Sequence, residues 1–250
     1  MSLALLLAAI FGASFILTMV GLGGGLVFAP LFILLGYPVA TAIPASLFLN
    51  GIAALSAAIT YFRKGMVDLK TALPLLLSST LAAPLGAMLT GIIDGRLFAA
   101  IMAVVVLGAA LRMLFSGKAE AREATISDLA RILGGSAIGI ASGVLGGLLG
   151  IGGGVFIVPL LIYVLKMPAK AAAATSIFIV MFPSFSGFIA HVTLAAPDWR
   201  FILLAALFSF AGGQLGSRLM SEKLKGRAVR RIFGVVLLIL FLKLLQKAFL

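Results

Sequence analysis

The 250-residue chain contains no cysteine, which excludes disulfide bonds, thiolate metal sites and thiol redox chemistry. It has one histidine and seven acidic residues, and only 10% of its residues are charged, against about 25% in a soluble domain. No acidic or basic residue stands in the middle of an expected membrane span, so the sequence offers no carboxylate relay for protons. We therefore expect no catalytic residue, no metal site and no cofactor.

What the sequence has in abundance is apolar residues. They make up 63% of the chain, and the mean hydropathy is +1.28. Apolar runs of about 20 residues, long enough to span a membrane as a helix, recur along the whole length. The formal net charge of +12 is typical of cytoplasmic loops rather than of nucleic-acid binding. These features predict an all-α polytopic membrane protein.

The sequence also repeats itself. The motif GLGGG at residues 21–25 returns as GIGGG at residues 150–154, an offset of 129, and further matches follow at an offset of 130. We therefore divide the chain into a first repeat unit (1–115), a polar cytoplasmic linker (116–127) and a second repeat unit (128–250). Each unit begins with a glycine-broken apolar run. The three helices that follow it are expected at residues 39–62, 69–91 and 96–115, and again at 169–194, 199–221 and 228–249.

The positive charges predict how the glycine-broken runs lie in the membrane. If each run turns back at its glycines, the two units are inverted, and the lysines and arginines divide 15 to 4 between the two sides. If each run crosses once, they divide 10 to 9, which gives no bias. The positive-inside rule favours the inverted repeat, with the linker in the cytoplasm and both termini outside. Sequence alone leaves open whether each run is re-entrant or a pair of full crossings.

The glycine clusters predict two half-helices that begin near the membrane midplane. The apolar arm after each cluster has about a dozen residues, or about 18 Å of helix, which is too short for a core of about 30 Å. Glycine permits a tight turn, and the unpaired first amides and the helix dipole place partial positive charge there. Two such N-termini would bind a small anion. The alternative is that the glycines only allow close helix packing.

Polar groups inside the expected spans complete the candidate site. Ser46 and Asn50 are four residues apart and share one helix face. A buried serine or threonine often only bonds a neighbouring helix, whereas an amide costs more to bury. Asp68 and Asp198 are expected as helix N-caps. The candidate substrate-binding residues are Gly21, Gly23, Gly24, Gly25, Gly150, Gly152, Gly153, Gly154, Ser46, Asn50, Thr175, Ser176 and Gln214.

Several segments resemble the sulfite exporter TauE/SafE family, over about residues 10–245. They are GLGGGLVFAPLF, GIGGGVFIVPLL, AAAATSIF and GGQLGSRL, together with the duplication. The resemblance implies a permease for a small sulfur-containing anion, such as sulfite, sulfoacetate or another organosulfonate, in the bacterial inner membrane. The first unit has Ala45 where the second has Thr175, and Pro84 where the second has Gln214. The site is therefore expected to be asymmetric in detail.

We expect transport by alternating access of one unit against the other around a central site. An anion channel and a permease for a non-sulfur organic anion are alternatives, and an intramembrane hydrolase is a remote one. Such a hydrolase would pair Ser186 with His191, but these side chains diverge by about 140° on one helix, so we expect no enzyme. The expected partners are the anion and the lipid bilayer, with no nucleic acid. Homodimer formation is left open.

Overall fold

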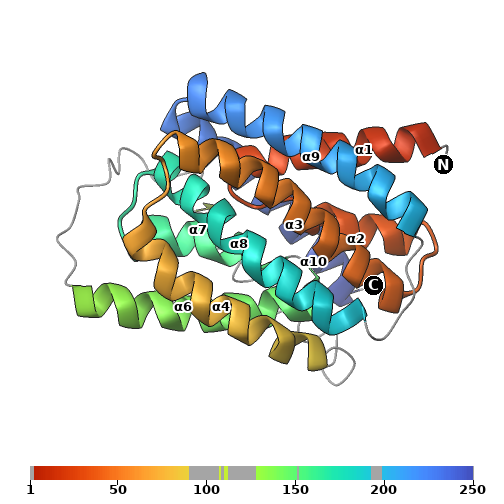
Figure 1. The fold of residues 1–250 in the computed structure, drawn as a ribbon, viewed down its shortest axis with the longest axis horizontal. Coiled ribbons are helices and arrows are strands. Elements are labelled where there is room, and N and C mark those ends of the chain that lie inside the picture. Colours follow the sequence, from red (N-terminus) through yellow and green to blue (C-terminus); the bar gives the residue numbers. More distant parts are fainter. Residues whose placement is uncertain are drawn as a thin grey trace.

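The computed structural model of the protein describes residues 3–89, 107, 110–111, 128–150, 152–192 and 199–249. In these residues every regular element is an α-helix (Figure 1). Among the described helices, α3, α4, α8 and α9 are each long and apolar enough to cross a membrane, and shorter apolar helices accompany them. The prediction of an all-α polytopic membrane protein is confirmed.

The helices begin close to the positions that the sequence predicts. The helix expected at 96–115 lies mostly outside the described residues, as do the linker (116–127) and the expected cap Asp198. The Asp68 carboxylate caps α4 by accepting hydrogen bonds from Thr71 N (3.3 Å) and Thr71 Oγ1 (2.7 Å), as predicted. The described helices are α1 (Leu3–Met19), α2 (Gly25–Leu34), α3 (Val39–Arg63), α4 (Leu69–Met88), α6 (Asp128–Leu149), α7 (Gly154–Tyr163), α8 (Ala169–Val192), α9 (Trp199–Glu222) and α10 (Gly226–Phe249).

Each glycine cluster ends one helix and starts a short one. Both α2 and α7 have 10 residues, or about 15 Å of helix, half of what a membrane core requires. The chain turns back at the first break: α1 packs along α9, and the Phe32 ring near the end of α2 contacts Phe201 near the start of α9, at 6.0 Å between centroids. In Figure 1, α2 returns toward the end from which α1 came, and α7 does the same beside α6.

Contacts between the two halves of the chain occur in matched pairs. Ser56 Oγ of α3 donates to Phe210 O of α9 (2.7 Å), and the equivalent Ser186 Oγ of α8 donates to Thr80 O of α4 (2.9 Å). In the same way α9 packs on α1 as α4 packs on α6, while α3 packs on α8. A two-fold relation between the halves would produce this correspondence. It supports the inverted repeat, which stays a prediction.

Glycines outside the two breaks bring helix backbones together. On α6, a Cβ at Gly139, Gly143 or Gly147 would collide with the α4 backbone. On α9, a Cβ at Gly212 or Gly216 would collide with the α1 backbone. These glycines recur every four residues and so lie on one helix face. At these positions glycine allows the helix backbones to pack closely.

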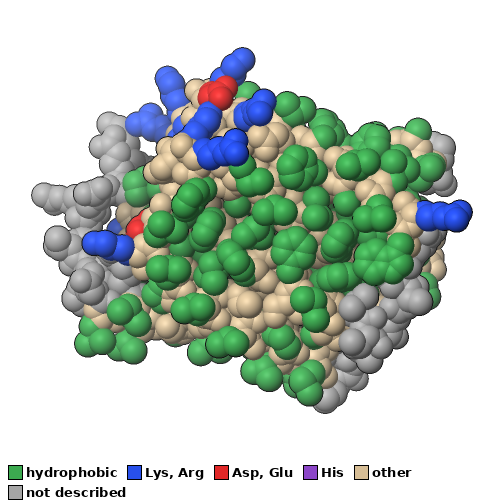
Figure 2. All heavy atoms as spheres, viewed as in Figure 1, with side chains coloured by type: hydrophobic (Ala, Val, Ile, Leu, Met, Phe, Trp, Pro, Cys, Tyr) green, Lys and Arg blue, Asp and Glu red, His purple; other side chains and the backbone are tan. Residues whose placement is uncertain are grey.

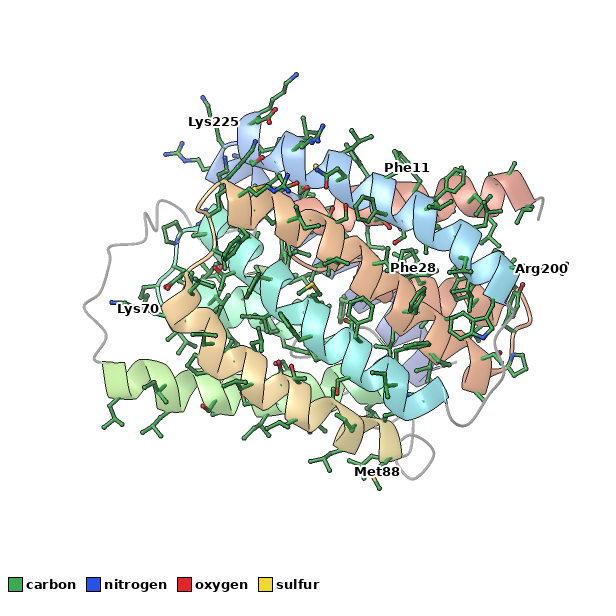
Figure 3. The ribbon with its side chains drawn as sticks, viewed as in Figure 1. Phe11, Phe28, Lys70, Met88, Arg200 and Lys225 are labelled. Carbon is green, nitrogen blue, oxygen red and sulfur yellow. The ribbon has the colours of Figure 1, made fainter. Side chains whose placement is uncertain are left out.

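Basic side chains gather at one end of the described helices, which we call the basic end. Figure 2 shows them clustered there, and Figure 3 places Lys70 and Lys225 at this end and Arg200 at the opposite one. Such an asymmetry matches the one-sided charge distribution expected from the sequence, while the orientation in the membrane stays a prediction. The basic end carries Arg63, Lys64, Lys70, Lys166, Lys170, Arg218, Lys223, Lys225, Arg227, Arg230 and Arg231.

Candidate functional site

The two glycine breaks meet each other in the interior of the helix bundle, at a place we call the crossing. A Cβ on Gly154, the first residue of α7, would lie 3.0 Å from Gly21 O. Ser46 Oγ of α3 donates to Gly150 O (3.0 Å), and the equivalent Ser176 Oγ of α8 donates to Gly21 O (2.8 Å). Each serine therefore holds the first glycine of the other half, so both breaks are fixed against each other.

Backbone geometry explains why these positions are glycine. Gly21 and Gly23 have φ of +90° and +72°, and Gly150, Gly152 and Gly153 have φ of +71°, +72° and +81°. In this left-handed region, side chains with a Cβ are disfavoured. The chain must adopt it to reverse direction within a few residues, so the glycine motifs encode the two turns.

The start of α2 is capped by a side chain from α3. Asn50 Oδ1 accepts hydrogen bonds from Gly24 N (2.6 Å) and Gly25 N (2.8 Å), two amides that lack partners within the helix. Asn50 Nδ2 donates to Ser184 Oγ of α8 (2.8 Å), which in turn donates to Val180 O (2.7 Å). Asn50 is fully buried. Its carboxamide thus links the α2 turn, α3 and α8.

The start of α7 has no equivalent cap. Val180 stands where the repeat would place the counterpart of Asn50, and it has no polar atom in its side chain. In the part of the chain that the structure describes, no side-chain acceptor bonds the amides of Gly154 or Val155. A Cβ on Gly152 would collide with Asn50 Nδ2, so this donor faces the second break. Comparing residues 50 and 180 between the repeats would have revealed this asymmetry from the sequence.

The crossing offers neutral hydrogen-bond donors and no ionised group. Among the described residues, no Asp, Glu, Lys or Arg side chain is buried, and no group of three His, Cys, Asp or Glu side chains is placed to hold a metal ion. The buried N–H groups of the α7 turn and of the Asn50 carboxamide, with a helix dipole behind them, favour a negative charge. Such donors can bind an anion reversibly.

Most of the predicted site residues come together here, and two do not. Thr175 Oγ1 accepts from Asp68 N (3.0 Å) and so ties α8 to the turn between α3 and α4. Gln214 lies between α3 and α9, bonded to Ser56 and Thr60. The crossing contains Gly21, Gly23, Gly24, Gly25, Gly150, Gly152, Gly153, Gly154, Ser46, Asn50 and Ser176. Ser184 also belongs to it, although the sequence analysis did not select it as a binding residue.

The side chains considered for a hydrolase are engaged elsewhere. Ser186 Oγ donates to Thr80 O (2.9 Å), and His191 Nδ1 lies 2.9 Å from Gly187 O of its own helix. Within the described residues, neither Ser184 nor Ser186 bonds His191. These described side chains therefore form no serine–histidine pair.

Comparisons with known proteins agree with this architecture. The sequence model of the sulfite exporter TauE/SafE family matches residues 6–244. The chain is 26% identical over 253 residues to the "Probable membrane transporter protein YunE" of Bacillus subtilis, covering 92% of both chains. It is 27% identical over 220 residues to YdhB of the same species, covering 86% of this chain and 89% of that protein. A "Probable membrane transporter protein" of Xylella fastidiosa is 31% identical over 185 residues, covering 70% and 68%. No solved structure matches the chain significantly.

Proposed function

Because the chain belongs to the sulfite exporter TauE/SafE family of multi-pass membrane transporters, we propose that it carries a small sulfur-containing anion across the bacterial inner membrane. Sulfite, sulfoacetate and other organosulfonates are the compounds that fit this proposal. The family supports the class of substrate, and the donors at the crossing support its charge.

The observation that carries the proposal is the unequal capping of the two half-helices. The α2 amides are bonded to Asn50 Oδ1, whereas the first amides of α7 have no side-chain acceptor in the described structure. An anion at the start of α7 would accept hydrogen bonds from these amides directly. It would also accept a hydrogen bond from Asn50 Nδ2. The α2 amides, which bond to Asn50 Oδ1, polarise the carboxamide and strengthen this donor. Both half-helices then act on one anion, one directly and one through Asn50.

Transport requires the crossing to open, since its glycines are closely packed. The bonds that join the halves there are few: those of Ser46 and Ser176 to backbone carbonyls, and that of Asn50 to Ser184. Each contributes about 1 kcal/mol net, and often less in a membrane protein. Thermal motion and anion binding can therefore exchange them. We propose that the two halves move against each other around the crossing, which gives alternating access.

A competition assay tests the substrate class. The purified protein is reconstituted in liposomes, and the uptake of labelled sulfoacetate is measured. Unlabelled sulfite, thiosulfate, taurine or lactate is added outside at equal concentration as a competitor. Taurine is a zwitterion of similar size to sulfoacetate, so it should compete at least tenfold less well. Equal competition by taurine would contradict the role of the helix ends. Strong competition by lactate alone would instead assign the protein to non-sulfur organic anions.

A further inference from the structure

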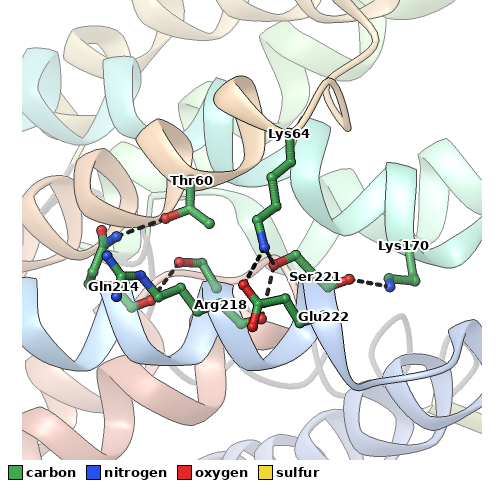
Figure 4. A network of polar contacts seen from close by, with 8 residues as sticks. Thr60, Lys64, Lys170, Gln214, Arg218, Ser221 and Glu222 are labelled. Carbon is green, nitrogen blue, oxygen red and sulfur yellow. Dashed lines mark hydrogen bonds and ion pairs between the residues drawn. The ribbon is translucent and has the colours of Figure 1, made fainter.

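A second polar array lies away from the crossing, between α3 and α9. Its members recur every four residues on each helix, so each set occupies one face, and the two faces meet (Figure 4). The array spans eight residues, or about 12 Å along the helices, and ends at the basic end. We call it the α3–α9 stripe; it consists of Ser56, Thr60 and Lys64 on α3 and Gln214, Arg218 and Glu222 on α9.

The inner part of the stripe is a connected hydrogen-bond network. Ser56 Oγ gives its single hydrogen to Phe210 O (2.7 Å), so it must accept from Gln214 Nε2 (3.2 Å). Gln214 Oε1 then accepts from Thr60 Oγ1 (3.0 Å) and Arg218 Nε (3.2 Å). Because Arg218 can only donate, this amide orientation is the one that satisfies every neighbour.

The outer part of the stripe is rich in cations. Lys64 Nζ donates to Ser221 Oγ (2.9 Å) and pairs with Glu222 at 2.6 Å. Lys170 Nζ of α8 donates to Ser221 O (2.9 Å). Lys64, Arg218 and Lys223 lie close enough to act on the charge of the one acidic residue, Glu222, so an anion approaching this end meets an excess of positive charge.

The matched interface between α4 and α8 lacks this polarity. Apart from Ser186, which repeats the bond of Ser56, its equivalent positions are apolar. Helices of this protein thus pack in the same arrangement without a polar stripe, and packing alone does not explain why α3 and α9 carry one. Ala190, Pro84 and Met88 stand in the places of Thr60, Gln214 and Arg218.

The stripe leads toward the crossing and stops at a close contact. A Cβ on Gly213 of α9 would lie 2.6 Å from Ala53 O of α3, which leaves no space between the helices at that level. Asn50 of the crossing is three residues, less than one helical turn, beyond Ala53. Along the axis of α3, the candidate anion site therefore begins less than one turn beyond this contact, on the face of α3 that meets α2 and α8.

We propose that the α3–α9 interface is the route between the crossing and the basic end. Arg218 and Lys64 attract the anion, and the contact of Gly213 with Ala53 is the constriction that opens. When α9 parts from α3, the bonds that Ser56, Thr60 and Gln214 make across the interface are released, and these groups become neutral donors along the way. Water fills the stripe when α9 parts from α3. The route rests on the proposed function, because it presumes an anion that leaves the crossing toward this end.

Cysteine substitution tests the route directly, since the chain has no native cysteine. Ser56→Cys and Thr60→Cys are treated in membrane vesicles with a charged, membrane-impermeant methanethiosulfonate reagent. Both side chains are buried at rest, so reaction requires the helices to part. Ile59→Cys is the depth-matched control, because Ile59 neighbours Thr60 but is 36% exposed on the outer surface. We expect both stripe cysteines to react from the basic side only, at least tenfold faster than Ile59→Cys, and their modification to abolish transport.

Two results would overturn the route. The first is no reaction at Ser56→Cys and Thr60→Cys, which is expected of a stripe that only bonds two helices or holds a lipid headgroup. The second is full transport after modification. The substrate class is tested separately. If modification blocks the transport of lactate but sulfoacetate is never transported, the route stands and the sulfur-anion proposal fails. A second variant, Arg218→Met, installs the residue of the matched interface; we expect KM from the basic side to rise about tenfold, with Arg218→Lys largely restoring it.

Discussion

Replacing Asn50 with aspartate places a fixed negative charge beside the proposed anion position without changing the shape of the side chain. The carboxylate still accepts from Gly24 N and Gly25 N, and the start of α2 favours its ionised form. Ser184 Oγ can rotate to donate to it. The protein should therefore fold. Two unit charges about 5 Å apart at an effective dielectric constant of about 20 repel by about 3 kcal/mol, a loss of affinity of about a hundredfold.

The assay is the KM for sulfoacetate uptake into liposomes, with thermal unfolding of the same preparation as a check of folding. The control is Asn50→Val, which copies Val180 at the equivalent position. It removes the cap and leaves two buried amides without an acceptor, so stability should fall by about 2 kcal/mol. If Asn50→Asp folds and its KM is unchanged, the anion does not bind near Asn50, and the crossing is not the site.

Three further experiments test the turns, the topology and the contact between the halves. Gly153→Val should reduce the transport rate more than tenfold, since Gly153 has φ of +81° and a Cβ there would lie 2.5 Å from a carbonyl of α6. Gly153→Ala adds a single methyl group at the same φ and should be milder, and a wild-type rate in Gly153→Val would refute the strain argument. A cysteine at Ala119 in the linker should react with an impermeant reagent only in inside-out vesicles, and its labelling in right-side-out vesicles would contradict the inverted topology. Ser46→Ala and Ser176→Ala each remove one matched bond between the halves, so each should lower the free energy of unfolding by about 1 kcal/mol; a clear difference between the two would count against the two-fold relation.

The sequence predicts the turns well because their cause is local. Only glycine adopts the backbone conformation of Gly21 and Gly152 without strain, so two matching glycine motifs indicate two matching reversals. The start of α4 is equally local, since Asp68 caps amides within its own turn. Such features depend on residues that are neighbours in the chain, so the sequence alone predicts them.

The sequence does not show which side chains bond each other when they are distant in the chain. Thr175 and Ser176 are adjacent in sequence, but successive residues of a helix point about 100° apart. Only Ser176 therefore faces the crossing, while Thr175 meets Asp68. Gln214 indicates by its polarity that it needs partners, yet only the packing of α9 on α3 shows that they lie outside the crossing.

Counterflow of labelled sulfoacetate tests the central claim, that the protein carries a small sulfur-containing anion by alternating access. Liposomes containing the protein are loaded with unlabelled sulfoacetate and diluted into a trace of the labelled compound. The account predicts a transient accumulation of label above equilibrium, with an initial rate that saturates and with no accumulation when taurine replaces sulfoacetate inside. Flux that stays linear in concentration without an overshoot would indicate a channel, and the absence of any protein-dependent flux of sulfur-containing anions would contradict the proposed substrate.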